Sequence, residues 1–114
     1  MNIETTIANQ RTFYQSNQTK DIAYRKQALR TLRKAIRNYQ KAIEEALYKD
    51  LHKSSTEAFM SEIGLVLEEL TFQLRHIDDF SKPSRRKTPL VHFPSVSFVV
   101  PQPYGVVLIM APWN

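Results

Sequence analysis

The chain has 114 residues, of which 42% are hydrophobic, and a formal net charge of +5 at pH 7. This length suits one small domain, which buries roughly 65% of the surface of its unfolded chain. The chain has no cysteine, so disulfides, thiolate metal sites and a cysteine nucleophile are excluded within these residues.

The N-terminus gives no sign of a secretory signal, because residues 1–6 lack a basic segment followed by an apolar one. The longest apolar run is far shorter than the ~20 residues that a membrane-spanning helix needs. We therefore expect a soluble, cytoplasmic protein.

A short helix is predicted at the start of the chain. Asn2 can cap it, and Ile3, Ile7 and Tyr14 lie roughly on one stripe of such a helix. The polar residues 16–19 then interrupt the pattern.

A longer helix is predicted to start at Thr19 or Asp21, with a kink or a restart at Asn38. Its apolar residues recur at helical spacing. They are Ile22, Leu29, Leu32, Ile36, Tyr39, Ile43 and Leu47.

A further helix follows Ser54, which with Glu57 has the spacing of a capping box. We expect it to end near Phe80 and to pack against the preceding helix as a hairpin. Gly64 within it suggests a close approach to another element. Its apolar stripe is Phe59, Ile63, Val66, Leu67, Leu70, Leu74 and Ile77.

The last third of the chain loses the helical period. Residues 82–94 contain three prolines and four basic residues and are predicted to be a linker. Residues 95–100 alternate, which is typical of a half-buried strand with Val96, Phe98 and Val100 on one side. The apolar run 106–110 lies between Gly105 and Pro112 and predicts a strand buried on both faces.

The closing stretch PYGVVLIMAPWN, residues 103–114, resembles the P-x-G-V-V-L-x-I-x-P-W-N signature of NAD(P)-dependent aldehyde dehydrogenases. Residues 46–53 and 57–63 are similar to the N-terminal helices of that family. The resemblance covers the whole chain but only about the first quarter of a family member. The chain starts close to the first helix, as in the family members that lack a long N-terminal arm.

The resemblance implies an α/β fold for the full protein, with a doubly wound, Rossmann-like cofactor domain. This fragment would be mostly α-helical with two C-terminal β-strands. Residues 1–81 would be the helical part of the cofactor-binding domain, 82–94 a linker, and 95–103 a strand of the bridging, oligomerising sheet. Residues 104–114 would be the first strand of the cofactor-binding domain, truncated.

The family resemblance also implies the chemistry. The enzyme would oxidise an aldehyde to a carboxylic acid with NAD or NADP, through a thiohemiacetal and a thioester on a cysteine downstream of this chain. Asn114 would donate a hydrogen bond to the oxyanion, a task that suits a neutral amide. The nicotinamide end of the cofactor would be lined by Met110, Ala111, Pro112 and Trp113. The fragment alone would be inactive.

The resemblance further implies an aldehyde as the substrate and a homo-oligomer, such as a dimer, for the full-length protein. We expect neither nucleic acid nor a membrane as a partner. We also expect no metal site, because His52, His76 and His92 are scattered along the sequence.

An alternative is a basic helical module that binds nucleic acid or an anionic surface. Aromatic residues are not interleaved with the basic ones, which disfavours a nucleic-acid site. The basic residues in question are Arg25, Lys26, Arg30, Arg33, Lys34, Arg37 and Lys41.

Overall fold

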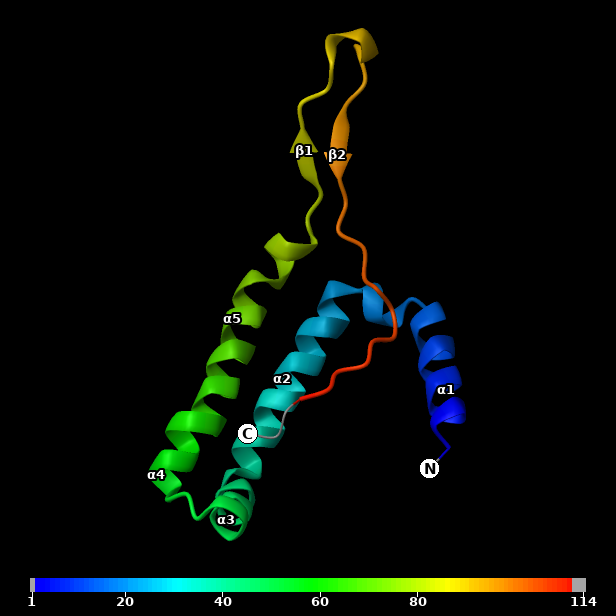
Figure 1. Ribbon diagram of the computed structural model, residues 1–114. Helices are drawn as coiled ribbons and strands as arrows, with labels where there is room; N and C mark the ends of the chain where they lie inside the picture. Colours follow the sequence, from blue (N-terminus) through cyan, green and yellow to red (C-terminus); the bar gives the residue numbers. More distant parts are fainter. Residues whose placement is uncertain (1, 112–114) are drawn as a thin grey trace. The chain divides into compact units, whose positions relative to one another are not determined.

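The structure, a computed structural model, describes residues 2–111. These residues are mostly helical, with two short antiparallel strands toward the C-terminus (Figure 1). The elements are α1 Ile3–Gln15, a 3-10 turn Gln18–Lys20, α2 Ile22–Asn38, α3 Gln40–Leu51, α4 Ser55–Ala58, a π-helical turn Phe59–Ile63, α5 Gly64–Ser81, β1 Ser84–Arg86, a 3-10 turn Leu90–His92 and β2 Ser97–Val99.

The chain forms two compact units. One unit is Arg25–Asp79, and the other holds the chain up to Tyr24 together with the chain from Phe80 onward. The first is a helical unit made of most of α2, then α3, α4 and most of α5. The second contains α1, the β1–β2 hairpin and the segment that leads to the predicted site.

The core of the helical unit lies along α5 and the turn before it. Ile63, Leu70 and Ile77 are 3%, 6% and 9% exposed, and Ala58 is fully buried. Residues seven apart lie on the same face of a helix, so the predicted stripe is confirmed at these three positions. It is wrong at Phe59 and at Val66, which are 42% and 47% exposed.

An ion pair joins the two long helices of this unit. The Lys26 ammonium in the first turns of α2 lies 2.5 Å from a carboxylate oxygen of Asp78, near the end of α5. The start of α2 therefore lies beside the end of α5, and the packing of the two apolar stripes against each other stays a prediction. Lys53 pairs with Glu62 across the connection at the other end. Within α2, Leu29 and Ile36 are half-buried.

Three local sequence signals are confirmed. The Asn2 side chain accepts a hydrogen bond from the Glu4 amide at 3.0 Å. The Ser54 hydroxyl accepts one from the Glu57 amide at 3.2 Å, which is the accepting half of the predicted capping box. The restart at Asn38 is also present, because α2 ends there and α3 begins at Gln40.

Gly64 makes its close approach within its own helix, so the expectation of a contact with another element is wrong. The Gly64 amide donates to the Phe59 carbonyl, which closes the π-helical turn. A Cβ atom on Gly64 would lie 2.8 Å from that carbonyl oxygen. A larger residue would therefore open the turn.

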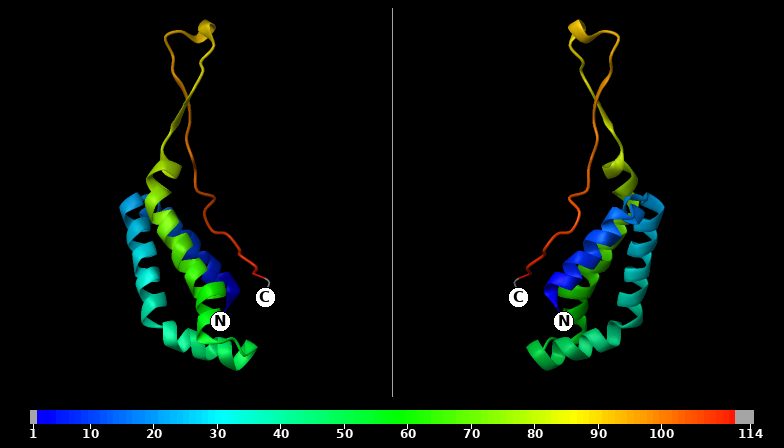
Figure 2. Two further views of the ribbon diagram at one scale, coloured as in Figure 1. Left: turned by 90° about the vertical axis from the view of Figure 1, so that its left-hand side faces the viewer. Right: turned by 90° about the vertical axis from the view of Figure 1, so that its right-hand side faces the viewer.

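The predicted linker 82–94 contains a strand, which corrects the expectation that it lacks regular structure. β1 pairs antiparallel with β2, with Arg85 opposite Phe98. The Thr88 hydroxyl accepts a hydrogen bond from the Ser97 amide at 2.9 Å and so extends the pairing. Figure 2 shows this hairpin and the turn at its tip from two further sides. The pairing depends on backbone groups, so the polar sequence of β1 gave no alternation to detect.

Two expectations about apolar strands are wrong in this structure. β2 lies within the predicted range 95–100, but its Phe98 side chain is 60% exposed rather than buried. Residues 106–110 form no strand. The reason is physical, since a strand needs a hydrogen-bonded neighbour, and β1 and β2 are paired only with each other.

Candidate functional site

The predicted site lies at the edge of the described chain. Pro112, Trp113 and Asn114 fall outside the described residues. Met110 and Ala111 are the last two that are described, and both are exposed, Met110 at 84%. The structure therefore describes the approach to the predicted site and two of its five residues.

The described residues do not by themselves fit a nicotinamide cofactor. A dinucleotide-binding turn uses several glycines to bring the backbone close to the phosphates, whereas this chain has only Gly64 and Gly105. Gly64 lies in a helix, and Gly105 lies before the apolar run. Because Met110 and Ala111 are exposed, they enclose no pocket here.

The approach to the site is held against α1. The Tyr14 hydroxyl donates a hydrogen bond to the Pro103 carbonyl at 3.1 Å. Gly105 has φ +98°, a conformation that residues with a Cβ rarely adopt. A Cβ atom built on Gly105 would lie 3.4 Å from the nearest carbon of the Tyr14 ring. Tyr14 thus contacts the segment 103–105, which directly precedes the apolar run.

Sequence reasoning placed Tyr14 on a stripe of the first helix but missed this contact. The nearest signal was the P-x-G pattern at 103–105, which predicts a tight turn but does not say which side chain lies on it. Lys20 adds a second contact, because its ammonium lies 5.8 Å from the centre of the Tyr14 ring. Phe13 packs edge-on against Tyr24, with ring centres 6.2 Å apart.

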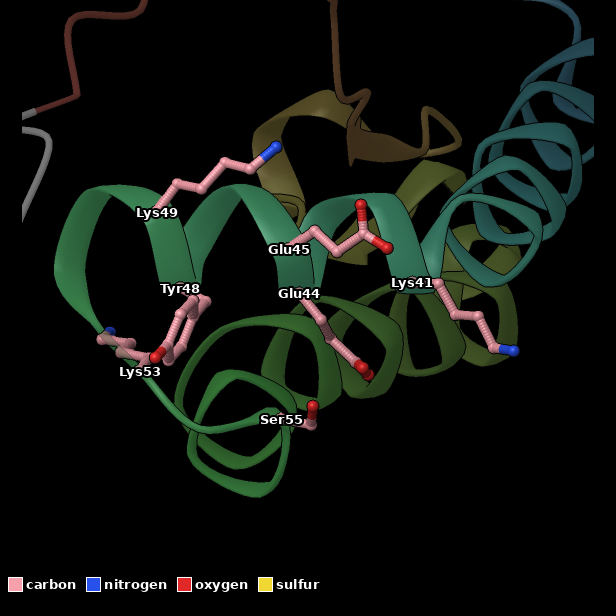
Figure 3. Close-up of a pocket in the computed structure, with 7 residues that line it drawn as sticks. All are labelled: Lys41, Glu44, Glu45, Tyr48, Lys49, Lys53 and Ser55. Carbon is pink, nitrogen blue, oxygen red and sulfur yellow. The ribbon is translucent and has the colours of Figure 1, made fainter.

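One open hollow, of about 510 Å³, lies beside α3 (Figure 3). Lys41 and Lys49 lie toward opposite ends of α3 in this view. Lys53, which pairs with Glu62, belongs to the same lining. The mixture of charges on a solvated surface gives no nucleophile with an adjacent base. The lining residues are Lys41, Glu44, Glu45, Tyr48, Lys49, Lys53 and Ser55.

A second hollow, of about 650 Å³, lies within the helical unit and is mainly apolar. It includes Phe59, Met60, Leu65 and Phe72, with Arg37 and Arg75 also in the lining. Neither Met110 nor Ala111, the two described residues of the predicted site, lines either hollow.

Metal sites and membrane spans can be looked for in the described part of the chain. Among residues 2–111, no group of three or more His, Asp or Glu side chains is placed to hold a metal ion. No helix in that range is long and apolar enough to cross a membrane. Four basic residues of α2 and α3 are exposed, and the basic-module alternative stays an untested prediction; they are Arg30, Lys34, Arg37 and Lys41.

Comparisons with known proteins identify the family. The sequence model of the aldehyde dehydrogenase family matches residues 1–114. The 4,4'-diaponeurosporen-aldehyde dehydrogenase of Staphylococcus aureus is 41% identical over 98% of this chain and 24% of its own length. Aldehyde dehydrogenase family 3 member F1 of Arabidopsis thaliana is 32% identical over 98% of this chain and 23% of its own length.

A solved structure agrees with the sequence comparisons. The substrate-bound state of Staphylococcus aureus AldH superposes with a TM-score of 0.86 and 39% identity, covering 91% of this chain and 23% of that one. The chain thus spans about a quarter of the length of the relatives it matches.

Proposed function

The chain belongs to the aldehyde dehydrogenase family, and we propose that it is the N-terminal part of an enzyme that oxidises an aldehyde to a carboxylic acid with NAD or NADP. The observation that carries the proposal is the family match over residues 1–114, which includes the closing motif 103–114. The aldehyde that names the S. aureus relative, 4,4'-diaponeurosporen-aldehyde, is the first substrate to assay.

Asn114 is the residue of this chain to which we assign a catalytic role. Its amide N–H groups would donate to the aldehyde oxygen as negative charge develops there. An amide is neutral, so it stabilises the oxyanion without competing as a base or nucleophile. A cysteine nucleophile is needed as well, and the 114 residues contain none. We therefore expect the chain alone to be inactive.

Met110, Ala111, Pro112 and Trp113 would contact the nicotinamide end of the cofactor, whose chemistry is to accept the hydride. This assignment rests on the family resemblance of the motif. Pro112 would restrict the backbone just before Trp113. The phosphates would be held by residues outside this chain, in keeping with the lack of a glycine-rich turn here.

The same proposal extends to the domain layout. Residues 1–81 and 104–114 belong to the cofactor domain, and 95–103 contribute to a sheet that joins subunits of a homo-oligomer in the cytoplasm. Sedimentation of the full-length protein tests the assembly, and cell fractionation tests the location. A full-length monomer would contradict the assignment of 95–103.

The decisive experiment is Asn114→Ala in a full-length version. We expect turnover to fall by about 10²–10³-fold, with the affinity for the cofactor nearly unchanged. Asn38→Ala, at the exposed end of α2, is the matched control and should leave turnover as it is. A large loss of cofactor affinity with little loss of turnover would show that Asn114 has a different role.

A further inference from the structure

α1 makes a specific contact with a part of the chain far away in sequence. No residue of α1 is buried, and Ile3 is 69% exposed. Tyr14, in contrast, is half-buried, and its hydroxyl bonds to the Pro103 carbonyl, 89 residues further along the chain. Tyr14 is therefore the position at which this surface helix meets the approach to the predicted site.

The segment 103–105, which Tyr14 contacts, has little conformational freedom of its own. Pro103 has a fixed φ and no amide hydrogen, which leaves its carbonyl as the group that can be held. Gly105 takes φ +98°, which residues with a Cβ rarely adopt, and a Cβ built there would lie in ordinary van der Waals contact with the Tyr14 ring, 3.4 Å away. The Tyr14 hydroxyl and ring thus contact Pro103 and the space beside Gly105.

Residues 106–110, which follow this segment, are exposed. Leu108 and Ile109 are 82% and 83% exposed, and residues 106–110 have no strand partner. We therefore expect the direction in which residues 106–110 leave α1 to be set at 103–105, where Tyr14 contacts the chain.

We infer that Tyr14 is a positioning residue that pins the segment 103–105 to α1 and so sets the path of the segment that carries Met110 and Ala111. The pinning itself rests only on the contacts of Tyr14. Its consequence for catalysis, through the placement of Asn114, rests on the proposed function. The two parts are tested by separate measurements.

The pinning is tested in the 114-residue chain by nuclear magnetic resonance. Tyr14→Phe removes the hydroxyl and keeps the ring, so residues 106–111 should become more mobile while Gly105 keeps the shift caused by the nearby ring. Tyr14→Ala removes both, and the Gly105 resonance should move to its random-coil position. The matched control is Tyr39→Ala, because Tyr39 is 66% exposed and lies in the helical unit.

Circular dichroism of the same variants separates loss of the contact from loss of the helices. Retained helix content with a shifted Gly105 resonance supports the inference. An unchanged Gly105 resonance and unchanged mobility of 106–111 in Tyr14→Ala would overturn it. If Tyr14→Ala loses its helices, Tyr14→Phe alone decides the outcome by the mobility of 106–111.

The catalytic consequence is tested by a double-mutant cycle in a full-length version. Tyr14→Ala should lower kcat between about tenfold and about a hundredfold, as expected of a small misplacement, with a smaller change in KM. In the Asn114→Ala background the same change should have little further effect, because both act on one interaction. Additive losses of kcat in the double variant would refute action through Asn114. If Asn114→Ala alone left turnover unchanged, the proposed function would be refuted, while the resonance result for Tyr14 would still stand.

Discussion

Replacing Leu70 by Ala tests the core of the helical unit. Leu70 is 6% exposed on α5, midway between Ile63 and Ile77 on one face of the helix. The neighbouring leucines of the same helix provide a graded series, since Leu67 is half-buried and Leu65 is 57% exposed. The three substitutions remove the same atoms from one helix and differ mainly in burial.

The expected magnitude follows from that burial. Leu-to-Ala changes in protein cores cost about 2–5 kcal/mol, with the higher values where a cavity remains open. The buried hydrophobic residues of the described chain are Ala58, Ile63, Leu70 and Ile77. So thin a core can collapse around a lost side chain, and we expect about 2–3 kcal/mol at Leu70. Leu67→Ala should cost about half of that, and Leu65→Ala less than about 0.5 kcal/mol.

Thermal unfolding followed by circular dichroism gives the readout. A loss of about 2–3 kcal/mol in a unit of this size lowers the midpoint by about 10–20 °C, which is far outside the error of the method. Equal shifts for the three leucine variants would refute the reasoning. They would mean that α5 is not fixed in one orientation and that its apolar stripe does not decide which face is buried.

Further outcomes follow from local contacts. Ser54→Ala should destabilise the helical unit by about 0.5–2 kcal/mol through the lost cap, while Ser55→Ala, one residue on, serves as its control in the same unfolding assay. Lys26→Ala should cost less than about 1 kcal/mol, because its ion pair with Asp78 is partly exposed; a larger loss that persists at high salt would contradict this. The 114-residue chain should bind no NAD in titration calorimetry and should self-associate in sedimentation, and micromolar binding by a monomer would contradict both expectations.

The helices could be predicted because their signals are local. Asn2 and Ser54 supply caps within three residues of the amides that they bind. The spacing of Ile63, Leu70 and Ile77 fixes one face of α5 without reference to what covers it. Asn38, a poor helix former among good ones, marks the restart before α3. Each of these signals lies within a few turns of sequence.

The missed features depend on partners that are distant in sequence or on backbone geometry. β1 has the sequence Ser-Arg-Arg and is exposed throughout, so its pairing with β2 left no hydrophobic pattern. In the π-helical turn before Gly64 the backbone hydrogen bonds span five residues instead of four. The amino-acid composition of the turn does not distinguish these two patterns. The contact between Tyr14 and Pro103 spans 89 residues, and nothing in the period of the first helix singles out its partner.

The candidate site is predicted from a sequence motif, not from the geometry of the structure. Residues 103–114 identify the family by their order, whereas periodicity alone predicts only a buried strand followed by a loop. The oxyanion role proposed for Asn114 rests on this motif alone, because Asn114 lies outside the described residues. The residue that holds the approach, Tyr14, lies outside the motif and became visible only through its contacts.

For the apolar run 106–110, the burial predicted from the sequence differs from the exposure in the structure. Its composition is that of a strand covered on both faces, yet Leu108 and Ile109 are more than four-fifths exposed. A strand is stabilised by its neighbours, and the described residues offer this run none. The sequence therefore encodes a burial that this chain does not complete by itself. Exposed apolar backbone without a partner is prone to pair with another chain, which is the physical basis for expecting self-association. If the chain stays monomeric at high concentration, the run must be protected by contacts that its exposure in this structure does not show.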